Sequence, residues 1–167
     1  AELAVKKIKV IYEVLPAVFD PFDAIKPEAP LVHAKSNIAH RVHISEGDVE
    51  KGFSESDQVI EEVFKTQKVI HAQIEPHVAM AELDYDDKII VWSSNSRPFH
   101  YATNFARVMQ LPMTDFQIKT PGVGGGFGSK NEIVIEPWVA LLARKTKRQV
   151  KMMFNREEEF LATSVRH

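Results

Sequence analysis

Glycine is concentrated in one short stretch of the chain, and that stretch is the strongest candidate for chemistry. Five of the seven glycines lie within residues 122–128. Glycine has no Cβ, so it permits a positive φ and lets backbone N–H groups come close to a ligand. A strand is expected before this stretch and a helix start after it, which places the N–H groups at the positive end of a helix dipole. The pattern therefore indicates a site for a phosphate or another anion, and the alternative is a tight turn without a ligand.

The two familiar nucleotide-binding motifs do not fit these glycines. A P-loop requires adjacent Gly and Lys, but Ser129 separates Gly128 from Lys130. The dinucleotide fingerprint requires glycine at i, i+2 and i+5, and the last position falls on Phe127 or on Ser129. The sequence therefore disfavours an ordinary nucleotide-binding domain and favours another phosphate-bearing ligand. Lys130 is expected either to cap the following helix start or to pair with a phosphate.

The other residue types that could do chemistry are predicted to have structural roles. His71 and His77 are six residues apart, which does not match the spacing of a zinc helix, so hydrogen-bonded polar roles are predicted for them. The acidic run 157–159 is predicted to be a helix start rather than a general-acid pair. No catalytic residue and no metal ligand is therefore assigned within the chain.

Composition and charge exclude several classes of protein. Of the 167 residues 44% are apolar and 26% are charged, which is the composition of a globular domain rather than a disordered one. A formal net charge of −2 argues against binding nucleic acid through bulk electrostatics, and no apolar run predicts a membrane span. Without cysteine the chain itself forms no disulfide and ligates no iron–sulfur cluster, and a cytoplasmic location is expected. It opens without Met or a signal peptide and stops directly after a helical stretch, so it is expected to be a piece of a longer protein.

Strands and helices alternate along the chain, so the predicted fold class is α/β or mixed α+β. Strands are predicted over residues 5–14, 59–65, 116–118 and 150–154, and a hairpin over 78–94 with its turn at 86–88. Residues 20–30 contain three prolines and are predicted to be an irregular connector. Helices are predicted to begin at Asp48, at Pro98, near Pro137 and after the capping-box pair Asn155 and Glu158.

Two of these helices carry apolar residues at helical spacing, which are expected to face the core. In the first they are Phe99, Ala102, Ala106 and Met109, and in the second Trp138, Leu141 and Leu142. Phe99, Phe105 and Trp138 are predicted to be core residues rather than a platform on which bases stack.

The glycine stretch also has a specific sequence, Gly124-Gly125-Gly126-Phe127-Gly128-Ser129-Lys130. Further motifs accompany it: Val14-Leu15-Pro16-Ala17-Val18, Gly47-Asp48-Val49, Ile74-Glu75-Pro76-His77, Trp92-Ser93-Ser94, Leu111-Pro112 and Arg156-Glu157-Glu158-Glu159. The glycine stretch resembles the Gly-Gly-Gly-Phe-Gly-x-Lys loop in the molybdenum-cofactor subunit of the xanthine dehydrogenase and aldehyde oxidase family. The other motifs occur in that family's order, and the set covers essentially the whole chain.

The resemblance implies that the chain is part of a much longer subunit. Residues 1–38 would be the tail of a preceding hammerhead domain and a connector. Residues 39–167 would be the N-terminal portion of the molybdopterin-binding domain, a mixed sheet with packed helices. Members of the family hydroxylate purines, aldehydes or aromatic heterocycles with water as the oxygen source. The parent would be a molybdenum-dependent oxidoreductase and an oligomer, with iron–sulfur clusters and FAD in partner domains or subunits.

The resemblance also implies which residues lie at the molybdenum–molybdopterin cofactor. The family's glycine loop lies against the molybdenum centre and makes backbone contacts, which implicates Gly125, Gly126, Phe127 and Gly128 here. Many members have a Gln near the molybdenum after the Trp-x-x motif, and the candidate contact in this chain is Ser96. The catalytic Glu of the family comes from a distant C-terminal segment, so no catalytic residue is carried over.

Two departures from the family bear on substrate and activity. Purine-hydroxylating members have Glu directly after the loop Lys, where this chain has Asn131 followed by Glu132. Together with Ser96, this disfavours xanthine as the substrate. A non-catalytic module that binds a phosphate ligand or shapes an interface, and a degenerate paralogue, remain alternatives. The isolated chain is expected to bind no cofactor and to self-associate through faces that the rest of the subunit would cover.

Overall fold

The computed structural model of the chain describes residues 2–166. It divides into two units, Ala1–Glu61 and Glu62–His167, which are described separately. The described helices include none that is long and apolar enough to cross a bilayer.

The first unit contains three short helices joined by irregular segments. They are α1 (Glu2–Val5), α2 (Pro21–Ala24) and α3 (Val49–Ser54). Asp48 caps α3 by accepting a hydrogen bond of 3.0 Å from the Lys51 amide, which confirms the helical turn predicted there. Helix α2 lies inside the predicted irregular connector and is a correction. Its signal was available in the sequence, because Asp20 is an N-cap and proline is favoured in the first turn of a helix.

The strands predicted over residues 5–14 and 59–65 are wrong. Among the described residues, both segments lack strand structure, and their alternating apolar side chains are exposed. Val14 is 92% exposed in the first segment and Phe64 is 89% exposed in the second. Alternating apolar and polar residues form a strand only where a neighbouring strand pairs with them and one face is buried. Among the described residues these two segments have neither.

A four-stranded mixed sheet forms the centre of the second unit. Its strands are β1 (Val78–Leu83), β2 (Ile89–Ser93), β3 (Phe116–Lys119) and β4 (Val150–Met153), in the order β3-β2-β1-β4. Strand β1 is antiparallel to both β2 and β4, whereas β3 is parallel to β2. The predicted hairpin and the two later strands are confirmed, as is the mixed α/β fold class.

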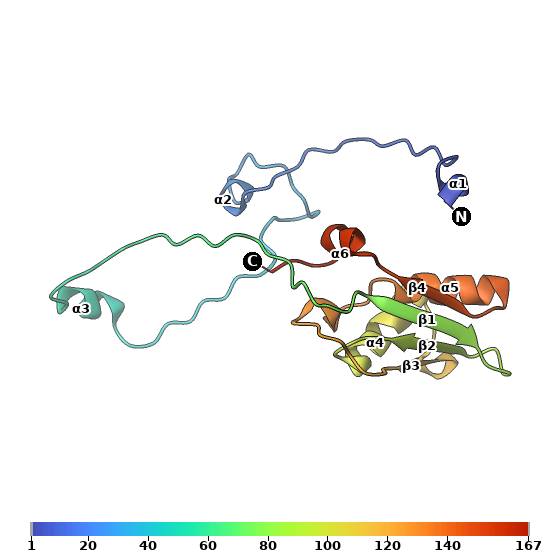
Figure 1. Ribbon diagram of the computed structural model, residues 1–167. Coiled ribbons are helices and arrows are strands. Elements are labelled where there is room, and N and C mark those ends of the chain that lie inside the picture. Colours follow the sequence, from blue (N-terminus) through green and yellow to red (C-terminus); the bar gives the residue numbers. More distant parts are fainter. Residues whose placement is uncertain (1, 167) are drawn as a thin grey trace. The chain divides into compact units, whose positions relative to one another are not determined.

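Two helices, α4 (Pro98–Met109) and α5 (Glu136–Thr146), pack against one face of this sheet (Figure 1). A third helix, α6 (Arg156–Ala162), follows β4 and begins with the predicted capping box between Asn155 and Glu158. Short 3-10 turns occupy Met113–Asp115 and Ser129–Asn131. The core between sheet and helices consists of Ala79, Ala81, Ile89, Val91, Phe105, Phe116, Ile135, Val139, Ala140 and Ala143.

The predicted helices are present. In α4 the expected residues Ala102, Ala106 and Met109 pack against the core but Phe99 does not, and α5 buries a different face from the one expected. Phe99 is 89% exposed and Trp138 is 61% exposed, so neither is a core residue, while Phe105 is fully buried as predicted. Helix α5 turns its small residues Val139, Ala140 and Ala143 to the sheet and leaves Leu141 and Leu142 on the other side. Each helix carries more than one apolar stripe, and helical spacing alone does not say which stripe faces the sheet.

Tyr101 on α4 provides a test of this packing. Its side chain is fully buried, and among the described groups its hydroxyl has no hydrogen-bond partner. Burial raises the pKa of this hydroxyl, and the nearby carboxylates of Glu136 and Glu132 raise the pKa further. Tyr101→Phe removes a buried polar group that gains nothing from folding, so we expect the free energy of unfolding to stay unchanged or to rise by about 1 kcal/mol.

Urea denaturation of the chain measures the effect of Tyr101→Phe. Tyr85→Phe is the matched control, because Tyr85 is 95% exposed and its hydroxyl is already hydrated. A loss of stability in Tyr101→Phe that is absent from the control would contradict the prediction and would show that an ordered water satisfies the hydroxyl.

Candidate functional site

The glycine stretch connects β3 to α5 and has an unusual backbone. Gly125 and Gly128 have φ values of +92° and +108°, which side chains with a Cβ rarely adopt. Phe127 between them also has a positive φ, +53°, and its side chain is 69% exposed. For a bulky residue this left-handed conformation costs on the order of 1–2 kcal/mol. Strain of this kind is found where a backbone must present its polar groups in one direction.

The amides of this stretch are available to a ligand. Among the residues the structure describes, the N–H groups of Gly125, Gly126, Phe127 and Gly128 donate to no acceptor. Gly126 is nevertheless buried. Consecutive backbone amides around left-handed residues form concave sites for anions. The stretch therefore fits an anionic group, such as a phosphate or an oxo ligand.

The structure brings the predicted site residues together. Ser96 follows β2 and its amide donates to the Lys130 carbonyl oxygen at 2.9 Å. Its Oγ lies 3.0 Å from the position that a Cβ on Gly126 would occupy. Ser96 therefore lies beside Gly126 in the glycine stretch, and a cofactor contact by these residues stays a prediction.

A partly buried ion pair holds the two ends of the glycine stretch. Lys130 has a fully buried side chain, and its Nζ lies 2.5 Å from Oε2 of Glu75 and 3.1 Å from Oγ of Ser94. The same Glu75 oxygen accepts from the Gly124 amide at 2.8 Å and from the Ser94 hydroxyl. Both alternatives predicted for Lys130 are therefore wrong, because its ammonium group neither caps a helix nor is free for a phosphate.

The surroundings of Glu75 keep its carboxyl group ionised. Partial burial by itself raises the pKa of Glu75, but hydrogen bonds from Lys130, Ser94 and the Gly124 amide, together with the Lys130 charge, lower it more. The net result is a pKa below the ordinary value. The ion pair is therefore present at neutral pH.

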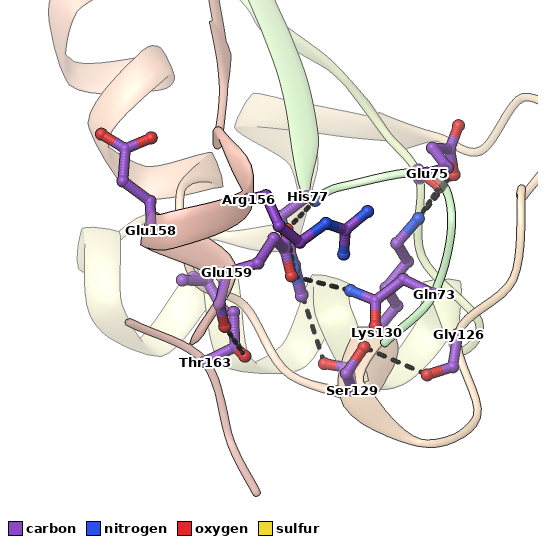
Figure 2. A network of polar contacts seen from close by, with 12 residues as sticks. Gln73, Glu75, His77, Gly126, Ser129, Lys130, Arg156, Glu158, Glu159 and Thr163 are labelled. Atoms are coloured by element: carbon purple, nitrogen blue, oxygen red, sulfur yellow. Dashed lines mark hydrogen bonds and ion pairs between the residues drawn. The ribbon is translucent and has the colours of Figure 1, made fainter. Parts of the chain in front are cut away.

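A second buried network lies on the other side of the stretch (Figure 2). Glu159 on α6 is fully buried and accepts from the backbone amide of His77 and from Nε2 of Gln73, the latter at 2.7 Å. The Nδ1 atom of His77 lies 2.9 Å and 3.0 Å from the two Glu159 oxygens, and its Nε2 lies 3.3 Å from the Ser129 carbonyl oxygen. The hydrogen-bonded role predicted for His77 is confirmed. For the acidic run the prediction holds for Glu158, which completes the capping box, but not for Glu159.

Two polar atoms beside the glycines have no partner among the described groups. They are the buried Nδ1 of His71 and Oε1 of Gln73. The His71 ring approaches to 3.3 Å from the position of a Cβ on Gly128, and the Gln73 Cβ to 3.4 Å from that of a Cβ on Gly125. No group of three His, Asp or Glu side chains in residues 2–166 is arranged to hold a metal ion.

Sequence reasoning found the glycines and missed the side chains that support them. Glu75 and His77 carried a signal, because a carboxylate and an imidazole flank Pro76 directly before a buried strand. Glu159 carried none, because a capping box explains an acidic helix start without it. The sequence also contains no signal that Lys130 is buried, since lysine is almost never buried unless it is paired.

Comparison with known proteins identifies the family to which the chain is similar. Residues 32–167 match the model of the family described as "Molybdopterin cofactor-binding domain". A subunit of a probable xanthine dehydrogenase from Bacillus subtilis is 34% identical over 100% of this chain and 22% of its own length. The nicotinate dehydrogenase large molybdopterin subunit from Eubacterium barkeri is 32% identical over 98% of this chain and 39% of its own length.

Solved structures show the same fold. The aldehyde oxidoreductase from Desulfovibrio gigas matches 99% of this chain with a TM-score of 0.87 and 26% identity, over 18% of its own chain. Quinoline 2-oxidoreductase from Pseudomonas putida 86 matches 99% with a TM-score of 0.85 and 29% identity, over 21% of its own chain. The chain thus spans between about a fifth and two fifths of the length of these relatives. The family match, the ordered motifs and the glycine stretch together show that the chain belongs to the molybdopterin cofactor-binding domain family of the xanthine dehydrogenase and aldehyde oxidase type.

Proposed function

We propose that this chain forms one wall of the molybdopterin site in a larger molybdenum hydroxylase subunit. In that role the amides of Gly125, Gly126, Phe127 and Gly128 donate to anionic groups of the cofactor, and Ser96 lies beside them. The observation that carries the proposal is the row of unpartnered amides around the buried Gly126. When bound, the cofactor supplies the redox centre at which a substrate carbon is hydroxylated with oxygen from water.

The chain's own residues have binding and positioning roles in this proposal. The Glu75–Lys130 ion pair fixes both ends of the glycine stretch, since Glu75 also accepts from the Gly124 amide. The unpaired Oε1 of Gln73 is an additional acceptor for a hydrogen-bond donor on a bound group. We assign no catalytic residue to this chain.

The substrate of the complete protein is proposed to be a purine, an aldehyde or an aromatic heterocycle. The relatives are named for xanthine, nicotinate, aldehyde and quinoline, which supports this range of compounds. Iron–sulfur and flavin partners that carry electrons away, an oligomeric enzyme, and a domain boundary near residue 38 remain part of the same proposal.

Metal and pterin analysis of the whole protein that carries this chain tests the proposal. We expect near-stoichiometric molybdenum and pterin, and turnover of at least one compound from a panel of xanthine, nicotinate, quinoline and an aldehyde. In water enriched in ¹⁸O, the product is expected to carry the label. Protein that binds phosphate at this stretch but holds no molybdenum would contradict the proposal and support the alternative of a non-catalytic phosphate-binding module.

A further inference from the structure

We propose that Glu159 is a positioning residue for the glycine stretch and that it acts through His77 and Ser129. The part of this inference that concerns the shape of the stretch is independent of the proposed function. The part that concerns cofactor retention rests on it.

The Glu159 carboxylate lies where an unpaired charge would lower the stability of the fold. Its side chain is fully buried, whereas the neighbouring Glu157 and Glu158 on the same helix are exposed. Three donors converge on it: the His77 amide, the His77 ring and the Gln73 side-chain amide. A buried carboxylate is tolerated only with this degree of pairing, so these contacts fix the orientation of the His77 ring.

His77 passes this orientation to the glycine stretch. Its Nδ1 faces Glu159 while its Nε2 faces the Ser129 carbonyl oxygen at 3.3 Å, so one ring joins α6 to the end of the stretch (Figure 2). Ser129 in turn donates to the Gly126 carbonyl oxygen twice, from its amide at 2.9 Å and from its Oγ at 3.0 Å.

Holding the Gly126 carbonyl group determines where the next amide points. The carbonyl of Gly126 and the N–H of Phe127 belong to one planar trans peptide, so their directions are opposite and cannot be changed separately. Because Ser129 binds the carbonyl oxygen, the Phe127 N–H is aimed away from Ser129 and has no acceptor among the described residues. Glu159 therefore sets, through two intermediates, the direction of an amide that the proposed function assigns to the cofactor.

A purely structural role for Glu159 makes a different prediction. If the carboxylate only anchored α6, losing its contacts would loosen α6 and leave the stretch unchanged. One substitution of His77 separates these roles. In His77→Asn the side-chain amide can replace Nδ1 opposite Glu159 but cannot reach Ser129.

Hydrogen exchange of the whole protein, prepared without cofactor, reports on the stretch through its hydrogen-bonded amides, among them Gly124, which donates to Glu75, and Ser129, which donates to the Gly126 carbonyl oxygen. In Glu159→Gln an amide nitrogen faces groups that are already donors, so we expect the peptide covering residues 121–131 to exchange roughly tenfold faster, as expected for loss of a charge-assisted hydrogen bond. His77→Asn is expected to show the same direction of change in this peptide while the peptide covering residues 156–163 stays protected. Glu157→Gln is the matched control on the same helix, and no change is expected for it.

Cofactor retention gives the second readout. We expect Glu159→Gln and His77→Asn to retain less molybdenum and pterin than Glu157→Gln, and the molybdenum EPR spectrum of the remaining cofactor to differ from that of the unmodified protein. Exchange of residues 121–131 at the unmodified rate in His77→Asn would overturn the positioning role. Faster exchange in a protein that never contains molybdenum would support the positioning role and contradict the proposed function, so the two failures are distinguishable.

Discussion

Replacing Glu75 by glutamine is expected to lower the free energy of unfolding by about 3–5 kcal/mol, because it leaves a buried charge without its partner. Lys130 has no exposed surface, and its ammonium group lies 2.5 Å from the Glu75 carboxylate. Glutamine can still accept a hydrogen bond from the Gly124 amide, but it cannot neutralise Lys130. Urea denaturation of the chain, followed by tryptophan fluorescence, measures the loss.

Removing Lys130 instead of Glu75 is expected to lower the free energy of unfolding by less. Lys130→Met leaves the Glu75 carboxylate, whose side chain is 32% exposed and still accepts from Ser94 and Gly124, so a loss of about 1–3 kcal/mol is expected. The matched control is Asp87→Asn, which removes an ion pair to Lys147 of similar length, 2.7 Å, with both side chains more than half exposed. Surface pairs contribute about 0–1 kcal/mol, so equal losses in Glu75→Gln and Asp87→Asn would contradict the burial argument.

The same ion pair predicts how stability depends on pH. The folded-state pKa of Glu75 lies below its ordinary value of 4.5, so the carboxylate's contribution is complete above that value and is lost as the pH falls through the folded-state pKa. Below it, protonated Glu75 leaves Lys130 unpaired in the unmodified chain as well. The difference in stability between the chain and Glu75→Gln should therefore shrink as the pH falls below 4.5 and through the lower folded-state pKa of Glu75.

Local sequence signals predicted the elements whose causes are local. The hairpin at residues 84–88, the capping box at Asn155 and Glu158, and proline in the first turn of α4 and α5 are each decided by neighbouring residues. The strands expected over residues 5–14 and 59–65 were predicted wrongly, because alternation alone does not supply the partner strand that a strand requires. The buried face of α5 was not predicted either, because the sheet selects Val139 and Ala143 over the larger Trp138 and Leu142.

The candidate site shows the same division. The glycine stretch could be predicted from the sequence because backbone positions with a positive φ favour glycine, as at Gly125 and Gly128. The side chains that support these glycines come from residues about 50 positions earlier and about 30 positions later in the chain. Periodicity in the sequence does not show that residues so far apart are in contact. Glu75 and His77 stand on either side of Pro76, yet they bind the adjacent residues Lys130 and Ser129 respectively. One short segment before β1 thus fixes the end of the glycine stretch from two directions.

Cofactor binding by the whole protein is expected to be lost when Gly128 is replaced by valine. With φ at +108°, any side chain at this position is strained, and a Cβ would lie 3.3 Å from Nε2 of His71. Where the stretch relieves this strain by leaving its binding conformation, about 1–2 kcal/mol corresponds to a Kd for the cofactor that is roughly tenfold weaker. Molybdenum content, measured together with the melting temperature, reports the effect.

Gly122→Val is the matched control, because it adds the same side chain in the same stretch where no atom lies within 4 Å of the added Cβ and φ is not in the strained range. It is expected to keep the cofactor. Phe127→Leu is expected to lose little, since a backbone contact survives a change of side chain. The three variants separate a binding surface from a strained turn: only the former predicts that Gly128→Val loses molybdenum at a temperature where the subunit is still folded. Full molybdenum content and turnover in Gly128→Val would show that the glycines form a structural turn and that the cofactor site lies elsewhere.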